Sequence, residues 1–213
     1  MCHHPQLRES ILSLGSNEGD RLLWLTRARA ALAAEDALAV RACSPVYETD
    51  PVDVPDAFAQ QRYLNQIVIV ETALEPQDFS RRMHAIEQRL GRTRGAVRNL
   101  PRTIDIDIIT LGDIRSADPE LTLPHPRAGT RRFVLQPLAD LRPDACLPGD
   151  TRTVSERLRD LPDVPRVTLF APPSGDASVR GMGVPPMKHG QDARATPASK
   201  RFCKNLCRKG ESP

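Results

Sequence analysis

The alternation of isoleucine and aspartate over residues 104–109 constrains the fold more than any other feature of the sequence. A period of two is typical of a β-strand, so one face of this strand is apolar and the other carries Asp105 and Asp107. Side chains two residues apart on a strand are separated by about 7 Å. Two carboxylates at this spacing repel each other unless a cation or basic side chains neutralise them. The stretch therefore predicts a half-buried strand with either a metal site or a solvated acidic face.

Arginines crowd the segments on either side of this strand. Seven lie there, namely Arg92, Arg94, Arg98, Arg102, Arg127, Arg131 and Arg132. Guanidinium groups bind phosphate oxygens, and Mg²⁺ takes oxygen ligands from carboxylates, water and substrate phosphates. The combination favours a polyphosphate site at which Asp105 and Asp107 bind Mg²⁺, although structural ion pairs would use the same residues. The chain has no GxxxxGK[ST] sequence, so it is not a P-loop enzyme.

Other positions are candidates for substrate contacts. His125, between two prolines, could donate a hydrogen bond to a phosphate or a leaving group, although a single loop histidine is more often incidental. Asn65 could form paired hydrogen bonds with a flat heterocycle, and Phe133 could stack on such a ring. The alternative for Asn65 and the nearby Tyr63 is the start of a strand with a packed tyrosine.

The apolar pattern predicts strands and helices in a definite order. Residues 11–14 and 66–71 favour strands, the second buried on both faces. Residues 40–47 favour an extended segment that Pro45 confines to a sheet edge. Apolar residues then recur at helical spacing in two segments: Leu22, Leu25, Ala28 and Leu32 in the first, and Phe79, Met83, Ile86 and Leu90 in the second.

With the acidic strand, this order is β-α-β-β-α-β. It predicts a single α+β domain of the ferredoxin-like plan, in which two helices back one face of an antiparallel sheet. A further helix is expected over residues 154–161. We expect the domain to span residues 10–170, after an N-terminal extension of nine residues.

Charge is divided unevenly along the chain. The formal net charge is +3, but residues 1–170 hold 22 arginines and 24 acidic residues, a net charge of −2. Residues 171–213 hold eight basic and three acidic residues and show no sustained apolar period. This composition favours a disordered basic tail over one that binds nucleic acid or an anionic surface.

Several classes of protein are excluded by composition. No apolar run is long enough to cross a bilayer, and the N-terminus lacks the features of a secretory signal. The five cysteines are scattered, odd in number and without zinc-site spacing. We therefore expect a cytoplasmic protein with free thiols and no membrane partner.

A series of short motifs runs along roughly residues 10–145. In order they are Leu14-Gly15-Ser16-Asn17, Ser44-Pro45-Val46-Tyr47-Glu48-Thr49, Tyr63-Leu64-Asn65, Gly91-Arg92, Pro101-Arg102-Thr103-Ile104-Asp105-Ile106-Asp107, Pro124-His125-Pro126-Arg127, Arg131-Arg132-Phe133-Val134-Leu135 and Pro137-Leu138. This ordered set resembles the hydroxymethyl-dihydropterin pyrophosphokinase family of folate biosynthesis.

The resemblance implies transfer of pyrophosphate from ATP to the hydroxymethyl group of a reduced pterin, with release of AMP. Asp105 and Asp107 would bind two Mg²⁺ ions. The residues implied to act on ATP are Arg92, Arg102, Ile108, His125 and Arg131, of which Arg92, Arg102 and His125 would be catalytic. The pterin pocket would consist of Thr49, Val52, Tyr63, Asn65 and Phe133. Three mobile loops would correspond to residues 15–20, 49–62 and 92–101, and the enzyme would be a monomer.

The chain departs from well-known members of that family at several positions. Asn99 replaces a loop tryptophan found in some members, Leu100 a small residue, and Gly95 and Glu120 basic residues. These changes affect the expected rates and affinities more than the expected reaction. Two alternatives remain: a catalytically inactive relative, and a nucleic-acid-binding module with the same β-α-β-β-α-β order, which would need aromatic residues on its sheet.

Overall fold

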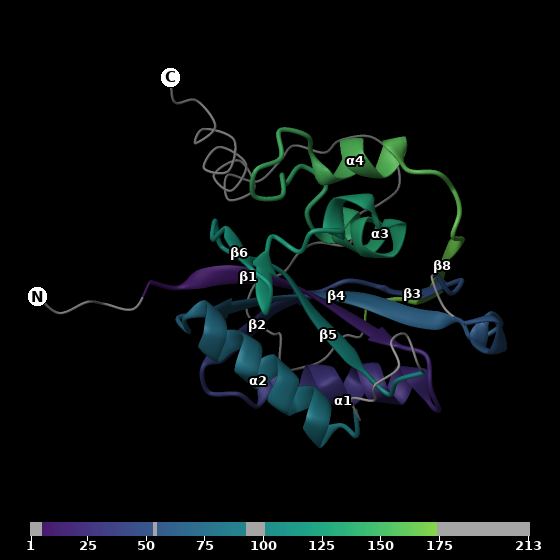
Figure 1. Ribbon diagram of the computed structural model, residues 1–213, viewed down its shortest axis with the longest axis horizontal. Coiled ribbons are helices and arrows are strands. Elements are labelled where there is room, and N and C mark those ends of the chain that lie inside the picture. Colours follow the sequence, from purple (N-terminus) through teal and green to yellow (C-terminus); the bar gives the residue numbers. More distant parts are fainter. Residues whose placement is uncertain (1–5, 53–54, 93–100, 174–213) are drawn as a thin grey trace, which may run out of the picture.

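A computed structural model describes residues 6–52, 55–92 and 101–173. The first seven main elements follow the β-α-β-β-α-β order, with the second strand split in two (Figure 1). They are β1 (Arg8–Ser16), α1 (Arg21–Ala33), β2 (Leu38–Cys43), β3 (Val46–Thr49), β4 (Tyr63–Thr72), α2 (Pro76–Arg89) and β5 (Asp105–Leu111). The predicted ferredoxin-like α+β plan is confirmed.

Further elements follow β5. They are β6 (Ser116–Asp118), β7 (Leu121–Leu123), α3 (Arg132–Leu141), α4 (Val154–Asp160) and β8 (Val167–Ala171), with short 3-10 turns at Asp56–Phe58 and Ala128–Thr130. Of these, only α4 was predicted. Pro137 inside α3 obscures that helix in the sequence, because proline is rare in helix interiors.

The main sheet has the strand order β5-β1-β4-β3-β8, and β2 pairs with the other half of β4. All of these pairings are antiparallel. Residues 67–70 of β4 are fully buried, which confirms the predicted central strand. The expectation that residues 40–47 lie at a sheet edge is wrong for β3, because β8 pairs with its second side.

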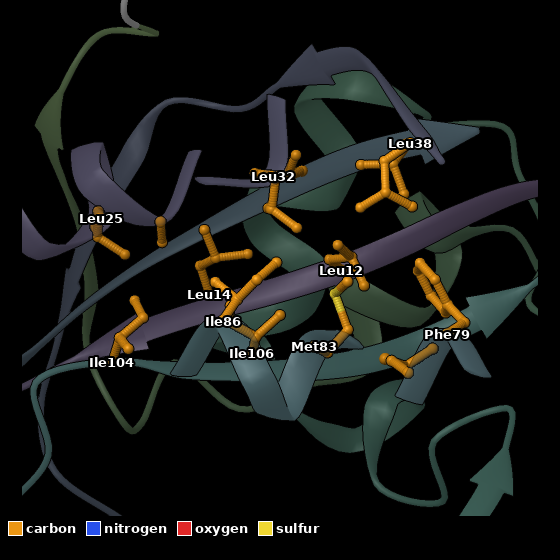
Figure 2. Packing of buried hydrophobic residues seen from close by; sticks show 14 of the residues in the cluster. Leu12, Leu14, Leu25, Leu32, Leu38, Phe79, Met83, Ile86, Ile104 and Ile106 are labelled. Atoms are coloured by element: carbon orange, nitrogen blue, oxygen red, sulfur yellow. The ribbon is translucent and has the colours of Figure 1, made fainter. Parts of the chain in front are cut away.

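Helices α1 and α2 cover one face of the sheet and bury its first apolar cluster (Figures 1 and 2). Phe79, Met83 and Ile86 of α2 pack there in one cluster with Leu12 and Leu14 of β1 and with Ile106 and Ile108 of β5. This confirms the predicted apolar stripe of α2. The helix ends at Arg89, and Gly91, two residues later, has a φ of +86°. In α1, Leu25, Ala28 and Leu32 are buried as predicted. Leu22, in the first turn, is instead exposed.

Helices α3 and α4 lie on the opposite side of the sheet (Figure 1). Val134, Leu135 and Leu138 of α3 pack against Ile67 and Ile69 of β4 and their neighbours on β1 and β5. The prediction of helices on one face alone is therefore incomplete. As a result, the side chains of β1, β4 and β5 that point toward α3 are sheltered from solvent.

Regular structure extends slightly past the expected domain limits at both ends. β1 begins at Arg8, within the stretch expected to precede the domain, and β8 ends at Ala171, one residue past the expected limit. Residues 174–213 of the expected tail lie outside the described part of the chain. Over the described ranges, no helix has both the length and the apolar character needed to span a membrane.

Candidate active site

Asp105 and Asp107 project from β5 on the sheet face covered by α3. Ile106 and Ile108 belong to the apolar cluster under α1 and α2, whereas Ile109 belongs to the cluster under α3. Alternation along the strand therefore places the two aspartates on the α3 side. The predicted division of this strand into an apolar and an acidic face is confirmed.

Two arginines bind the Asp105 carboxylate. Arg102 donates from NH1 to Oδ2 at 2.6 Å, and Arg92 donates to Oδ1. Burial alone would lower the pKa of Arg92, but Asp105 and Glu87 raise it above its ordinary value. Each carboxylate oxygen has two lone pairs, so Asp105 retains the capacity to bind a cation beside these guanidinium groups.

Glu87 of α2 is a member of this cluster that sequence reasoning missed. It is 1% exposed, and its Oε1 accepts hydrogen bonds from Arg92 and, at 2.7 Å, from the backbone N–H of Ile106. Burial raises the pKa of Glu87 to about 7, with a further contribution from Asp105, while Arg92 acts in the opposite direction. The signal in the sequence was an acid four residues after Met83, on the apolar stripe of α2.

The Asp107 carboxylate lies in a poorly compensated position. Burial, and then repulsion from Asp105, raise its pKa to about 6, although Arg131, Arg92 and Arg102 favour the ionised form. Positive charge added beside it would therefore be favourable. No group of three or more histidine, cysteine or acidic residues that could hold a metal occurs in the described part of the chain. A pair of carboxylates suits Mg²⁺, which completes its shell with phosphate and water oxygens.

His125 is held beside β5. Its backbone N–H donates to the carbonyl of Ile109 at 2.8 Å, and its Nδ1 accepts from the N–H of Arg127 at 3.2 Å. This second bond places the proton of the neutral imidazole on Nε2. Burial lowers the pKa of His125, and the positive charges of Arg131 and Arg127 lower it further. The neutral ring therefore offers Nε2–H as a donor.

Thr49, Tyr63 and Asn65 meet at the junction of β3 and β4. The Asn65 side chain, 4% exposed, donates to Thr49 Oγ1 at 2.8 Å, and Tyr63 pairs with Thr49 across the two strands. Val52, in the connection that follows β3, is 42% exposed. Four of the five predicted pterin contacts therefore lie on or next to one hairpin.

Gly15 of β1 joins this hairpin to the acidic strand. It pairs with Asn65 on one side and Asp105 on the other. A Cβ atom at this position would lie 3.3 Å from Asn65 Oδ1 and 4.0 Å from Asp105 Cβ. The absence of a side chain at Gly15 thus lets Asn65 Oδ1 approach the backbone of β1 closely, between the predicted pterin and metal residues.

The start of α3 adds Arg131 and Phe133. The Arg131 guanidinium carbon lies 5.2 Å from the centre of the Phe133 ring. Phe133 packs at the margin of the α3 cluster, and Arg131 influences both Asp107 and His125 electrostatically. Arg131 therefore links Phe133 at the start of α3 to Asp107 of the acidic strand and to His125.

Other predicted positions are separate from these residues or lie outside the described part of the chain. Arg132 instead bonds to the Leu161 carbonyl at 3.1 Å and to Asp163 at 3.0 Å, which is a structural role. The side chain of Ile108 is 9% exposed and packs on the opposite face, so an ATP contact there would involve its backbone. Arg94, Gly95, Arg98, Asn99 and Leu100 lie outside the described residues.

Comparison with known proteins points to the same family as the sequence motifs. Residues 11–143 match the model of the family described as 7,8-dihydro-6-hydroxymethylpterin-pyrophosphokinase (HPPK). The 2-amino-4-hydroxy-6-hydroxymethyldihydropteridine pyrophosphokinase of Bacillus subtilis is 42% identical over 130 residues, 61% of this chain and 75% of that protein. The Synechocystis enzyme of the same name is 34% identical over 156 residues, 73% of this chain and 77% of its own.

A solved structure of a Plasmodium falciparum HPPK-DHPS variant also resembles the fold. Its TM-score is 0.59 and its sequence identity 14%, over 74% of this chain. The present chain spans 46% of that longer chain, so less than half of it is matched. At this level of identity the likeness shows the fold.

Proposed function

The chain belongs to the 7,8-dihydro-6-hydroxymethylpterin-pyrophosphokinase family, and we propose which of its residues perform the transfer. It transfers pyrophosphate from ATP to the hydroxymethyl group of 6-hydroxymethyl-7,8-dihydropterin in folate biosynthesis, and AMP is released. ATP and the pterin are therefore its substrates. The assignment of residues, the metal requirement and the assembly state are our proposals.

We propose that Asp105 and Asp107 bind two Mg²⁺ ions together with the ATP phosphates. The observation that carries this proposal is a partly buried carboxylate, Asp107, which lies beside a second carboxylate, Asp105, in a cluster of arginines. Bound Mg²⁺ would neutralise the phosphate oxygens and polarise the group that is transferred.

The arginines and histidine would act on the triphosphate. The pterin hydroxymethyl oxygen loses its proton to solvent and bonds to the β-phosphorus of ATP. The bond from that phosphorus to the bridging oxygen of the α-phosphate breaks, and AMP leaves with that oxygen. Arg92 and Arg102 are held beside Asp105, where their charges can stabilise the phosphoryl group during transfer. His125 Nε2–H and Arg131 would donate to phosphate oxygens.

The hairpin of β3 and β4 would bind the pterin. The flat ring requires hydrogen bonds along one edge and an apolar face above it. Asn65 and Thr49 supply buried polar groups beside Gly15, and Tyr63, Val52 and Phe133 supply aromatic and apolar surface. This arrangement would present the hydroxymethyl group toward Asp105.

We further propose a cytoplasmic monomer without a nucleic-acid partner. Cys43 and Cys146, the cysteines in the described part of the chain, carry thiols, which suits a reducing compartment. The rival nucleic-acid module would use an open sheet face with aromatic side chains. Here α3 covers the face that α1 and α2 leave open, and α4 packs against α3 (Figure 1). Residues 67–70 of the central strand are aliphatic.

Magnesium titration of turnover tests the assignment of the acidic strand. Wild type is expected to release AMP only with added Mg²⁺, and Asp107→Asn to lose at least about a hundredfold in rate at saturating Mg²⁺. Asp113→Asn, at an exposed position after β5, is the matched control and should behave as wild type. Equal Mg²⁺ dependence and rate in the Asp107 variant would refute the metal assignment. An inactive wild type would favour the catalytically dead relative.

A further inference from the structure

Four charged side chains lie at the end of the β3–β4 hairpin where the connection between the two strands begins and ends. Glu48 binds Arg21 through Oε1 at 3.0 Å and Arg62 through Oε2 at 3.1 Å. The Nε of Arg62 also lies 3.3 Å from Asp50 Oδ1, and Arg21 NH1 donates to the carbonyl of Arg62 at 3.0 Å. We call Arg21, Glu48, Asp50 and Arg62 the hairpin-base cluster.

Glu48 is the centre of this cluster. Its side chain is 19% exposed, whereas those of Arg62 and Asp50 are 56% and 43% exposed. Partial burial alone would raise the pKa of Glu48, but Arg21 and Arg62 hold it below its ordinary value. The carboxylate is therefore charged at neutral pH and links α1 to both strands of the hairpin.

The cluster is interleaved with the proposed pterin residues. Glu48 and Asp50 lie on either side of Thr49 in the sequence, and Arg62 directly precedes Tyr63. Neighbouring residues of a strand point to opposite faces. The ion pairs of Glu48 therefore lie on one face of the hairpin, and the hydrogen bond between Thr49 and Asn65 lies on the other.

β8 supports the same base from the other side. Thr168 pairs with Glu48, and the N–H of Asp50 donates to the carbonyl of Arg166 at 3.2 Å. This strand lies beyond the region matched by the family model, which ends at residue 143. The bracing of the hairpin therefore uses a segment outside the family match.

We propose that the hairpin-base cluster positions the pterin pocket without touching the pterin. This proposal rests on the proposed pterin contacts of Thr49, Tyr63 and Asn65. The ion pair between Asp50 and Arg62 joins the two ends of the connection between β3 and β4, so fewer arrangements of that connection compete with the binding-competent one. Preorganisation of this kind increases affinity because less ordering is required on binding.

The test compares Arg62→Gln with a matched variant, Arg41→Gln. Arg41 forms a comparable surface pair with Glu71, at 2.5 Å and with side chains 50% and 32% exposed, on β2 and β4 away from the pterin residues. In Arg62→Gln, we expect the pterin KM to rise about fivefold, equivalent to ~1 kcal/mol. The kcat and the KM for ATP should remain within about twofold of wild type. Arg62→Lys should restore most of the pterin affinity, and Arg41→Gln should match wild type.

Salt provides a second readout. High salt weakens exposed ion pairs, so it should raise the pterin KM in wild type and have less effect in Arg62→Gln. A pterin KM unchanged from that of Arg41→Gln would overturn the proposal, as would equal losses for ATP and pterin. An inactive wild type would instead refute the proposed function, and direct titration of pterin binding to both variants would then still decide the role of the cluster.

Discussion

Replacement of Asp107 by asparagine is expected to stabilise the metal-free protein. Burial and the neighbouring Asp105 raise the pKa of Asp107 from 3.8 to about 6, so its ionised form is disfavoured in the folded state. The difference between the two values is equivalent to about 3 kcal/mol of unfolding free energy. Asparagine keeps the shape of the side chain and removes the charge. The variant should therefore gain up to about 3 kcal/mol at pH 8.

The sign of the pH dependence follows from linkage. An acid with a raised pKa binds its proton more tightly in the folded state than in the unfolded state. Its ionisation therefore destabilises the fold above about pH 6, and the penalty decreases as the pH falls through 6 toward 4. The advantage of Asp107→Asn should accordingly drop below about 1 kcal/mol at pH 4.

Urea unfolding in the presence of a chelator measures this effect, with the fluorescence of the single tryptophan, Trp24, as the signal. Asp113→Asn removes the same charge at an exposed position and should change stability by no more than about 0.5 kcal/mol at either pH. A less stable Asp107→Asn at pH 8, or an equal gain at pH 4 and pH 8, would refute the electrostatic reasoning. Added Mg²⁺ should stabilise wild type more than the variant.

Three other perturbations test different parts of the site. Arg102→Ala should lower kcat about a hundredfold or more with little change in pterin affinity, as measured by steady-state kinetics and direct titration, because its charge acts on the group in transfer. Gly15→Ala would place a methyl group 3.3 Å from Asn65 Oδ1, so calorimetry should show pterin affinity reduced by about tenfold or more with the fold retained. A chain that ends at residue 173 should keep wild-type turnover, since every residue proposed to contact substrate lies within residues 49–133. Normal kinetics in the first two variants, or lost turnover in the third, would contradict these roles.

The elements that the sequence predicted well are those with a local signal. The period of two in residues 104–109 gave the strand and its two faces, and helical spacing with a final glycine gave α2. Helix α3 was missed because Pro137 interrupts its pattern, and β8 because it is short and follows a segment rich in loops. α3 is held by packing against the sheet and β8 by pairing with β3, and the local sequence carries little signal for either contact.

The site was predictable in its residue types but not in its assembly. Paired acids and nearby arginines pointed to a metal and phosphate site, and the motif resemblance supplied the pterin residues. The register that places Gly15 between Asn65 and Asp105 depends on pairing between strands far apart in the sequence. The role of Glu87 depends on its reach from α2 to the backbone of β5. Neither contact follows from local periodicity.

The fate of the β-phosphate of ATP tests the proposed chemistry most directly. The protein is incubated with Mg²⁺, 6-hydroxymethyl-7,8-dihydropterin and ATP labelled at the β-phosphorus, and the nucleotide and pterin products are separated and counted. Attack at the β-phosphorus predicts AMP without label and a pterin diphosphate that carries all of it, in equal amounts, with product formation greatly reduced in Asp107→Asn. Labelled ADP with a pterin monophosphate, or full activity in Asp107→Asn, would contradict the proposed reaction at the acidic strand.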